Sequence, residues 1–212
     1  MKEEKILIPS GAIQIESLIK IHEVLPFKGG VIFCHPHPQY GGDMYNHVIT
    51  TAVEAASQEG LSTLRFNFRG VGESGGSHEE GIGEREDVKA VIEYFISILK
   101  DAHPSLILLG YSFGAWAGLP IAIQDKRING MVTIAPPLQV YDFGFLWGCK
   151  KKKLFIVGDQ DLFCPASLLE EWYGYLEEPK SLAIIPGADH FFFSHVHLLT
   201  QPLREFFRTI QG

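Results

Sequence analysis

The residues best suited to chemistry in this sequence begin with a serine held between two glycines. Ser112 is the centre of GYSFG (110–114), which follows the apolar run SLILLG and precedes the helix-like run GAWAGLPIAI. A serine hydroxyl is a weak nucleophile. A sharp turn between a strand and a helix exposes it, and the helix N-terminus directs backbone N–H groups toward developing negative charge. The pattern therefore predicts that Ser112 is a nucleophile for acyl transfer.

A serine nucleophile of this kind needs a base and an acid, which follow the serine in the order acid, then histidine. Asp159 and Asp161 both lie in GDQD (158–161) after the apolar run KLFIVG, and His190 lies in PGADHF after the run SLAIIPG. Both groups come just past the carboxyl ends of predicted strands, where open parallel sheets place their sites. His190 is the predicted base and Asp161 the favoured acid; Asp159 is the alternative, with stabilisation of the turn as its other role.

The elements that must position these residues alternate along the chain. Alternating apolar and polar residues predict a half-exposed strand at 13–24, joined by the turn at 9–11 to a strand at about 3–9. Short apolar runs bounded by Gly, Pro or Ser predict buried strands at 31–35, 61–68, 105–110, 130–135, 153–158 and 181–187. Helical patterns cover 44–60, 84–100, 113–124, 165–176 and 195–209. This alternation predicts a single α/β domain over 1–212, with a mostly parallel eight-stranded sheet, helices on both faces, and the first two strands as an antiparallel edge.

Five stretches together are highly specific: HPHPQYGGDMYN (35–46), FNFRGVGESGG (66–76), GYSFG (110–114), GDQD (158–161) and GADHFF (187–192). On these stretches the chain resembles the α/β-hydrolase superfamily along nearly its whole length. It is particularly similar to small bacterial dienelactone-hydrolase-like enzymes and to the catalytic domains of Xaa-Pro dipeptidyl peptidases. The resemblance implies an α/β-hydrolase fold with Ser112, Asp161 and His190 as a catalytic triad.

The same resemblance bears on the oxyanion hole. HPHP (35–38) stands where many relatives have His-Gly. Because Pro36 and Pro38 have no N–H to donate, the backbone N–H of His37 is the candidate second donor, beside that of Phe113.

The candidate substrate contacts are Tyr40, Tyr111, Phe143 and Trp147. Only about 17 residues (136–152) separate the sixth and seventh predicted strands, so no large cap domain fits there. The aromatic residues of this segment could form a short apolar flap over the acyl group, or a small amphipathic helix packed on the core. Tyr40, Asn46 and Arg69 could shape the mouth of the site or only form hydrogen bonds within loops.

Composition excludes several classes of function. A net charge of -7, from 18 basic and 25 acidic residues, has none of the basic character of a nucleic-acid binder. Three widely spaced cysteines favour a reducing compartment, and no apolar run approaches the ~20 residues of a membrane helix, so a cytoplasmic protein is expected.

Two motifs are rejected as cofactor sites. GVGESG (70–75) fits G-x-G-x-x-G, but a helix is predicted at 84–100, where a dinucleotide site would have its second strand. The pairs His35/His37 and His195/His197 have no third metal ligand at a persuasive spacing. No cofactor and no metal are therefore expected.

The predicted reaction is hydrolysis of a small or medium acyl ester through an acyl-enzyme on Ser112. A serine peptidase or amidase acting on short peptides is the alternative enzyme. A non-catalytic binding protein on the same fold is the third hypothesis, which an intact Ser, Asp and His disfavours.

Overall fold

A computed structural model describes residues 3–22, 29–99 and 105–210 of the chain. Three strands come first in it, and strands and helices largely alternate after them. They are β1 (Glu4–Ser10), β2 (Ile13–Lys20), β3 (Gly30–Cys34), α1 (His47–Gln58), β4 (Ser62–Phe66), α2 (Ile82–Ile98), β5 (Leu106–Tyr111), α3 (Phe113–Gln124), β6 (Ile128–Ile134), β7 (Lys152–Gly158), α4 (Ala166–Gly174), β8 (Lys180–Ile185) and α5 (Thr200–Ile210).

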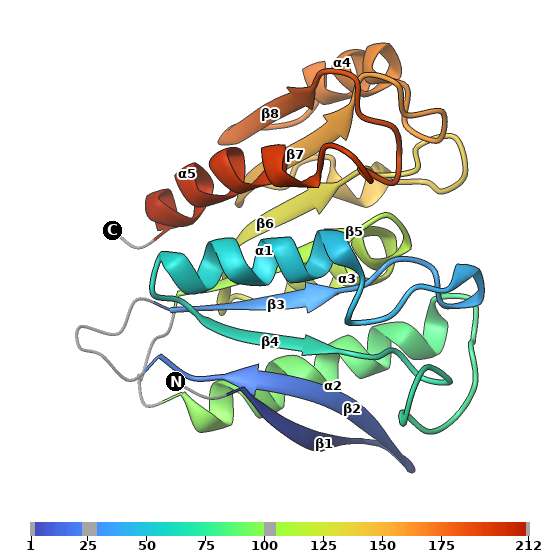
Figure 1. Cartoon of the computed structure of the whole chain (residues 1–212), viewed down its shortest axis with the longest axis vertical. Helices are drawn as coiled ribbons and strands as arrows, with labels where there is room; N and C mark the ends of the chain where they lie inside the picture. Colours follow the sequence, from blue (N-terminus) through green and yellow to red (C-terminus); the bar gives the residue numbers. More distant parts are fainter. Residues whose placement is uncertain (1–2, 23–28, 100–104, 211–212) are drawn as a thin grey trace.

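The strands form one eight-stranded sheet in the order β1-β2-β4-β3-β5-β6-β7-β8 (Figure 1). β1 and β2 pair antiparallel, β2 pairs antiparallel with β4, and every later pair is parallel. The prediction of a mostly parallel eight-stranded sheet with an antiparallel edge is confirmed. All the parallel strands point their carboxyl ends to the same edge of the sheet, where the predicted site residues follow them.

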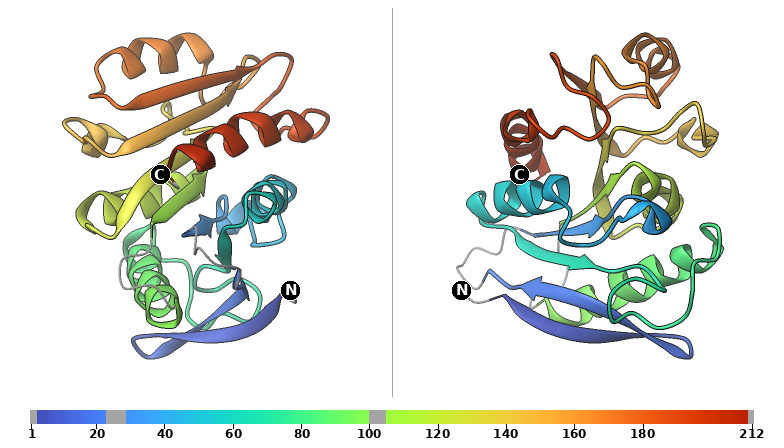
Figure 2. Two further views of the ribbon diagram at one scale, coloured as in Figure 1. Left: turned by 90° about the vertical axis from the view of Figure 1, so that its left-hand side faces the viewer. Right: turned by 45° about the vertical axis from the view of Figure 1, so that its right-hand side comes forward.

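The sheet is covered on both faces, and alternate residues of each strand face opposite helices. In β3, Ile32 and Cys34 belong to the core under α2, α3 and α4, while Val31 and Phe33 belong to the core under α1 and α5. Figure 2 shows the resulting three layers, with α1 and α5 on one side and α2 and α3 on the other. Burial on both faces explains why the parallel strands are nearly continuous apolar runs rather than alternating ones.

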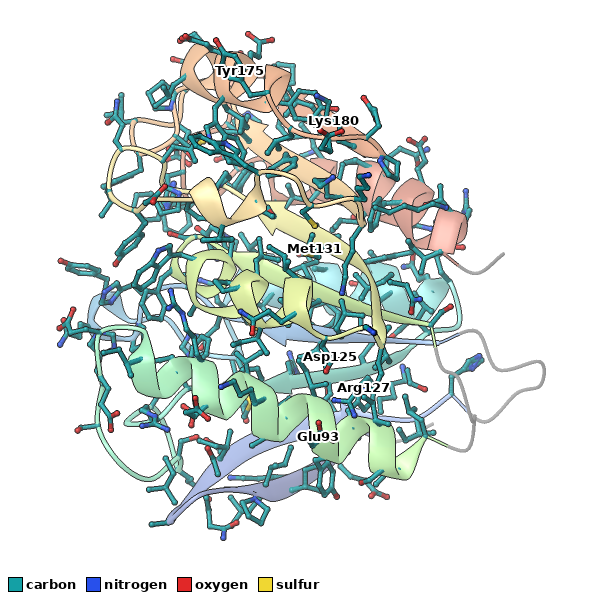
Figure 3. The ribbon with its side chains drawn as sticks, turned by 180° about the vertical axis from the view of Figure 1, so that it is seen from behind. Glu93, Asp125, Arg127, Met131, Tyr175 and Lys180 are labelled. Carbon is teal, nitrogen blue, oxygen red and sulfur yellow. The ribbon has the colours of Figure 1, made fainter. Side chains whose placement is uncertain are left out.

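On the rear face, one arginine joins two helices. Arg127, between α3 and β6, donates to Glu93 of α2 (Nη1 to Oε2, 3.0 Å) and to Asp125 at the end of α3 (Nε to Oδ1, 2.9 Å). Figure 3 shows the three side chains together. This ion-pair cluster fixes the far end of the β5-α3-β6 unit, whose near end carries Ser112.

Helix boundaries depart from the sequence prediction mainly near their first turns. α1 begins at His47 rather than 44 because the Asn46 side chain accepts the N–H of Val48 and caps the helix there. The helix expected over 195–209 is split into a 3-10 turn (Val196–Leu199) and α5. The ends of the second predicted strand (23–24) and of the second predicted helix (100) lie outside the described residues.

The segment between β6 and β7 is short and packs on the core. Its one helical turn is a 3-10 helix, Gly144–Leu146, and the side chains of Phe143 and Leu146 are buried. Of the two alternatives for this segment, the structure shows packing on the core, through a 3-10 turn rather than an amphipathic α-helix. No large cap domain covers the sheet in the described part of the chain, and no helix there is long and apolar enough to cross a membrane.

Candidate active site

The predicted site lies at the carboxyl end of β3, where the order of the strands changes direction: β4 lies on one side of β3, and β5 and the later strands lie on the other. β3 has β4 on one side and β5 on the other, so the loops that follow β3 and β5 diverge at the carboxyl edge. Such a switch point leaves a crevice that α/β proteins use for binding. His37 follows β3 and Ser112 follows β5, so the topology brings both to this point of the carboxyl edge.

Ser112 occupies a strained turn that only small neighbours allow. Its φ of 53° lies in the left-handed region, which disfavours residues with a side chain. A Cβ on Gly110 would lie 2.3 Å from the Cα of Ala115, and one on Gly114 would lie 2.2 Å from the carbonyl oxygen of Cys34. The two glycines of GYSFG are therefore required by close backbone approach.

The structure brings Ser112, His190 and Asp161 into one chain of hydrogen bonds. The Oγ of Ser112 lies 3.0 Å from Nε2 of His190, and Nδ1 of His190 lies 2.8 Å from Oδ2 of Asp161. The other carboxylate oxygen of Asp161 accepts the N–H groups of Phe163 and Cys164 at 2.8 and 2.9 Å. The side chains of Ser112, His190 and Asp161 are all largely buried, with Asp161 only 2% exposed. The arrangement can move a proton from a serine hydroxyl to a histidine whose orientation a carboxylate fixes.

The two aspartates of GDQD have different partners. Asp159 does not reach His190; its Oδ1 accepts the N–H of Gly187 at 2.7 Å and so ties the loop after β7 to the loop after β8. The N–H of Gln160 donates to the carbonyl of Ala188 in the same seam. Geometry thus separates the two candidates, since Asp161 orients the histidine and Asp159 holds the loops together.

Tyr111 holds the backbone of His190 in place. Its hydroxyl donates to the carbonyl oxygen of His190 at 2.9 Å, and its side chain is 2% exposed. Burial raises the pKa of Tyr111 above its usual range, so the hydroxyl remains a donor. Tyr111 therefore holds the backbone of His190 from within the core, and its predicted contact with substrate is wrong.

The backbone N–H groups of Phe113, the first residue of α3, and of His37 have no hydrogen-bond partner within the described residues. The rings of His37 and Phe113 are in contact, with centroids 4.7 Å apart. Both donors thus come from segments packed directly against each other, next to the nucleophile. Free donors at a helix N-terminus are suited to stabilising an oxyanion.

A buried histidine fixes the segment that carries His37. His35 is completely buried; its Nδ1 donates to the carbonyl of Pro36 (2.6 Å) and its Nε2 accepts the N–H of Phe68 (3.0 Å). These partners require the neutral ring, and burial lowers the pKa of His35 to about 4. The role of His35 is to position the loop, which nothing in its sequence neighbourhood revealed.

The other predicted substrate contacts have different outcomes. Tyr40 is exposed and its ring packs on His37 (4.7 Å), beside the candidate oxyanion donors. Trp147 is exposed, but its ring makes no aromatic contact within the described residues. Phe143 is only 2% exposed and packs against Phe145 and Trp172, so its predicted contact with substrate is wrong. An apolar residue near a site can face either the substrate or the core, and here the core encloses it.

Asn46 and Arg69 form hydrogen bonds within the structure. Asn46 caps α1, and Arg69 is paired with the completely buried Asp87 of α2, which also accepts the hydroxyl of Ser10. GVGESG (70–75) forms turns rather than the start of a helix. Among the described residues, no group of three or more His, Cys, Asp or Glu side chains could hold a metal ion.

Residues that the sequence prediction did not include line the other side of His190. The rings of Phe163 and Phe191 contact the His190 ring at 4.8 and 5.4 Å, and both are exposed to solvent. The available signal was their position, because each lies one or two residues after a predicted triad member. Because Phe163 and Phe191 are exposed, the packing of the core does not require aromatic side chains at these two positions.

Comparison with known proteins agrees with this geometry. The model of the alpha/beta hydrolase family matches residues 31–148, more than half of the chain. The uncharacterised protein RP471 of Rickettsia prowazekii (strain Madrid E) is 35% identical over 84% of this chain and 78% of its own length. A structure of an alpha-beta serine hydrolase homologue from Coxiella burnetii has a TM-score of 0.88 and 34% identity over 97% of each chain.

A third similar protein is XC6422 from Xanthomonas campestris, a member of the a/b serine hydrolases without lid. Its TM-score is 0.85, with 30% identity over 99% of this chain and 95% of that one. The chain therefore belongs to the α/β hydrolase family. Its relatives of known structure at 30–34% identity include serine hydrolases, and the present chain is a hydrolase of that family.

Proposed function

We propose that this protein is a carboxylic ester hydrolase that works through an acyl-enzyme on Ser112. The observation that carries the proposal is the pair of contacts from Ser112 Oγ to His190 Nε2 (3.0 Å) and from His190 Nδ1 to Asp161 Oδ2 (2.8 Å). A serine hydroxyl within hydrogen-bond distance of a histidine, itself oriented by a buried carboxylate, is the arrangement that acyl transfer requires.

In the proposed mechanism, Ser112 Oγ attacks the carbonyl carbon of the ester while its proton passes to Nε2 of His190. Asp161 stabilises the resulting imidazolium and keeps the ring in the required tautomer. The N–H groups of Phe113 and His37 would bind the oxygen of the tetrahedral intermediate. When the intermediate collapses, the C–O bond to the alcohol breaks and the alcohol oxygen takes the proton from His190. A water molecule then repeats the sequence and releases the acid.

Small or medium acyl groups fit the shape of the molecule. The segment between β6 and β7 packs on the core, and no large cap covers the sheet in the described part of the chain. The similar protein XC6422 is likewise a serine hydrolase without lid. A site without a cap offers little surface to enclose a long acyl chain.

The cysteines support a location in a reducing compartment, which we propose is the cytoplasm. Cys34, Cys149 and Cys164 are all buried and none is in a disulfide. Burial raises the pKa of Cys34 and of Cys164 above the usual range, so these thiols are protonated and unreactive.

Hydrolysis of p-nitrophenyl esters from acetate to decanoate, in the wild type and in Ser112→Ala, tests the proposal. We expect activity that is highest for the shorter acyl groups and falls at least about 1000-fold in a folded Ser112→Ala variant. A parallel series of p-nitroanilides tests the alternative of a peptidase or amidase. Activity on amides alone would favour that enzyme, and activity on neither series would favour a binding protein.

A further inference from the structure

Three phenylalanines form an exposed aromatic surface beside His190. The side chains of Phe163, Phe191 and Phe193 are 43%, 45% and 72% exposed. Phe191 contacts Phe163 at 6.4 Å and stacks on Phe193 at 5.7 Å, so the three rings are continuous. We call this surface the aromatic shelf. Contiguous exposed apolar surface is uncommon in soluble proteins unless it binds something.

The shelf is held rigidly by the residues around it. Phe192 has a φ of 56°, in the left-handed region, and its side chain is completely buried, so its two neighbours are turned outward. Asp189 Oδ1 accepts the N–H groups of Phe191 and Phe192 at 3.1 and 2.9 Å. A strained residue of this kind persists only where its surroundings enforce it, and such residues cluster at functional sites.

α1 supports the shelf from the other side. The ring of His47, the first residue of α1, stacks on Phe193 with centroids 5.1 Å apart, and its Nε2 lies 2.7 Å from the carbonyl oxygen of Phe191. The rings are therefore ordered before any ligand arrives. Preordered aromatic side chains lose little conformational entropy on binding, which favours recognition of an apolar group.

The chemistry decides which part of an ester would lie on the shelf. In the proposed mechanism His190 delivers a proton to the leaving oxygen, so that oxygen lies within hydrogen-bond distance of Nε2. Phe163 and Phe191 contact the ring of His190 itself, at 4.8 and 5.4 Å. A group attached to the leaving oxygen is therefore brought to the shelf.

The carbonyl oxygen of the ester would lie on the other side of Ser112. The candidate oxyanion donors, Phe113 and His37, belong to a separate group of rings that includes Tyr40 and Tyr141. No ring contact joins that group to the shelf within the described residues. The carbonyl oxygen and the leaving oxygen thus point toward two different aromatic surfaces.

We propose that the aromatic shelf binds the alcohol part of the substrate, and that the enzyme prefers esters of aromatic or bulky apolar alcohols over esters of small alcohols. This inference rests on the proposed function and adds the substrate class to it. A planar ring stacked on Phe191 would gain both apolar burial and an aromatic contact.

The test compares ethyl, benzyl and 2-naphthylmethyl acetates, which share one acyl group and have unactivated alcohols. Values of kcat/KM are measured by titrating the released acetic acid. For the wild type we expect the naphthylmethyl and benzyl esters to exceed the ethyl ester by roughly tenfold or more. In the double variant Phe163→Ala/Phe191→Ala the benzyl-to-ethyl ratio should fall at least about fivefold.

Ratios remove the effect that truncating Phe163 has on His190, because His190 serves every ester in the series. The leucine variants Phe163→Leu and Phe191→Leu keep an apolar side chain if the alanine variants do not fold, and should lower the ratio less. Tyr175→Ala is the matched control. Tyr175 is 74% exposed (Figure 3), and Lys180, the first residue of β8, donates to the carbonyls of the adjacent residues Gly174 and Leu176. This contact places Tyr175 toward the opposite edge of the sheet from the site, and its removal should leave the ratio unchanged.

An unchanged benzyl-to-ethyl ratio in the double variant would overturn the inference, as would a wild type that hydrolyses the three acetates equally. If that activity is also lost in Ser112→Ala, the proposed function stands and only the inference fails. A wild type that hydrolyses no ester at all would refute the proposed function and the inference together. A change confined to an acyl series, from ethyl acetate to ethyl hexanoate, would place the shelf on the acyl side and contradict the assignment.

Discussion

At the scale of single residues, the site depends on which side chain faces each nitrogen of His190. Ser112 Oγ lies at Nε2, and Asp161 Oδ2 lies at Nδ1. The carboxylate of Asp161 is further fixed by two backbone N–H groups. A carboxylate held in this way requires the proton of the neutral imidazole to be on Nδ1, so Nε2 is free to accept the serine proton.

Asp161→Asn tests this arrangement with Asp159→Asn as its matched control. An asparagine can still accept the N–H groups of Phe163 and Cys164, but its amide donates toward Nδ1 and favours the wrong tautomer. We expect kcat to fall by about 1000- to 10,000-fold with little loss of stability. Asp159→Asn should change kcat less than about tenfold, because the Asp159 side chain accepts hydrogen bonds from Gly187 and Gln160 and none from His190 within the described residues. Equal losses in the two variants would contradict the assignment of the acid.

His35 is expected to make stability depend on pH. Its pKa is about 4 in the folded protein because of burial, against about 6.5 for an exposed histidine. The unfolded chain therefore binds the proton more readily between these values. The stabilisation from neutral His35 is fully present above pH ~6.5 and is lost as the pH falls toward about 4, by up to roughly 3 kcal/mol.

Chemical denaturation from pH 4 to 7.5 measures this effect. In His35→Gln the free energy of unfolding should have a clearly smaller slope against pH over that interval, whatever its absolute value. The comparison is of slopes, since the loss of the bond to Phe68 also destabilises the variant at every pH. Parallel slopes would show that His35 is not kept neutral by the fold.

Sequence alone could identify the residues at this scale but not all of their partners. Asp159 and Asp161 lie two residues apart in one motif, and only the path of the loop decides which reaches His190. Phe143 has the composition of a substrate contact and of a core residue alike, and burial decides for the core. Phe163 and Phe191 were not singled out because their role depends on contact with a ring 27 residues or one residue away in the chain.

At the scale of elements, the site depends on how closely α3 approaches the end of β3. A Cβ at Gly114 would lie 2.2 Å from the carbonyl oxygen of Cys34 and 2.4 Å from that of His35. Both are backbone atoms that cannot rotate away. The segment that carries the His37 N–H is thus in direct contact with the first turn of the helix that follows Ser112.

Gly114→Ala is expected to lower the stability by about 1–3 kcal/mol and kcat by at least about tenfold, because the contact can be relieved only by moving the candidate oxyanion donors. Gly174→Ala, at the exposed end of α4 with nothing within 4 Å of the new Cβ, is the control. It should change the free energy of unfolding by less than about 1 kcal/mol and leave kcat unaltered. Thermal denaturation and ester hydrolysis on the same samples give both quantities. A Gly114→Ala enzyme with wild-type activity would contradict the close approach.

The elements themselves were largely predictable because their patterns are strong. Continuous apolar runs between turn residues located the parallel strands, apolar-polar alternation located the second strand, and the alternation with helices predicted the parallel sheet. The exact ends of the helices and strands were harder to predict from the sequence, because they depend on single contacts. Asn46 caps α1 through one hydrogen bond, and the 3-10 turn before α5 replaces the first turn of the predicted helix.

At the scale of the whole molecule, no large cap covers the carboxyl edge of the sheet in the described residues, because the crossover from β6 to β7 is short. Phe143 and Leu146 anchor that crossover in the core under α4, so it has no hinged element that could close over the site. Enzymes whose lids open at a lipid surface work faster when the substrate aggregates. We expect no such rise in rate for this protein.

Hydrolysis of a short-chain triglyceride is therefore expected to saturate smoothly as its concentration passes the solubility limit. The rate of acid release, measured on both sides of that limit, should follow one hyperbola. The exposed aromatic shelf could itself bind to the surface of the emulsion, so Phe193→Ala serves as the comparison. A sharp rise in rate when the emulsion forms, in the wild type, would contradict the absence of a closing element.

The most direct test of the central claim is covalent labelling of the nucleophile. The intact protein is treated with a fluorophosphonate and its mass is measured, followed by peptide mapping, for the wild type, Ser112→Ala and His190→Ala. We predict one adduct per chain, located on Ser112, that is absent in Ser112→Ala and forms much more slowly in His190→Ala. A folded wild type that stays unlabelled, or an adduct on another residue, would contradict a serine hydrolase built on Ser112, His190 and Asp161.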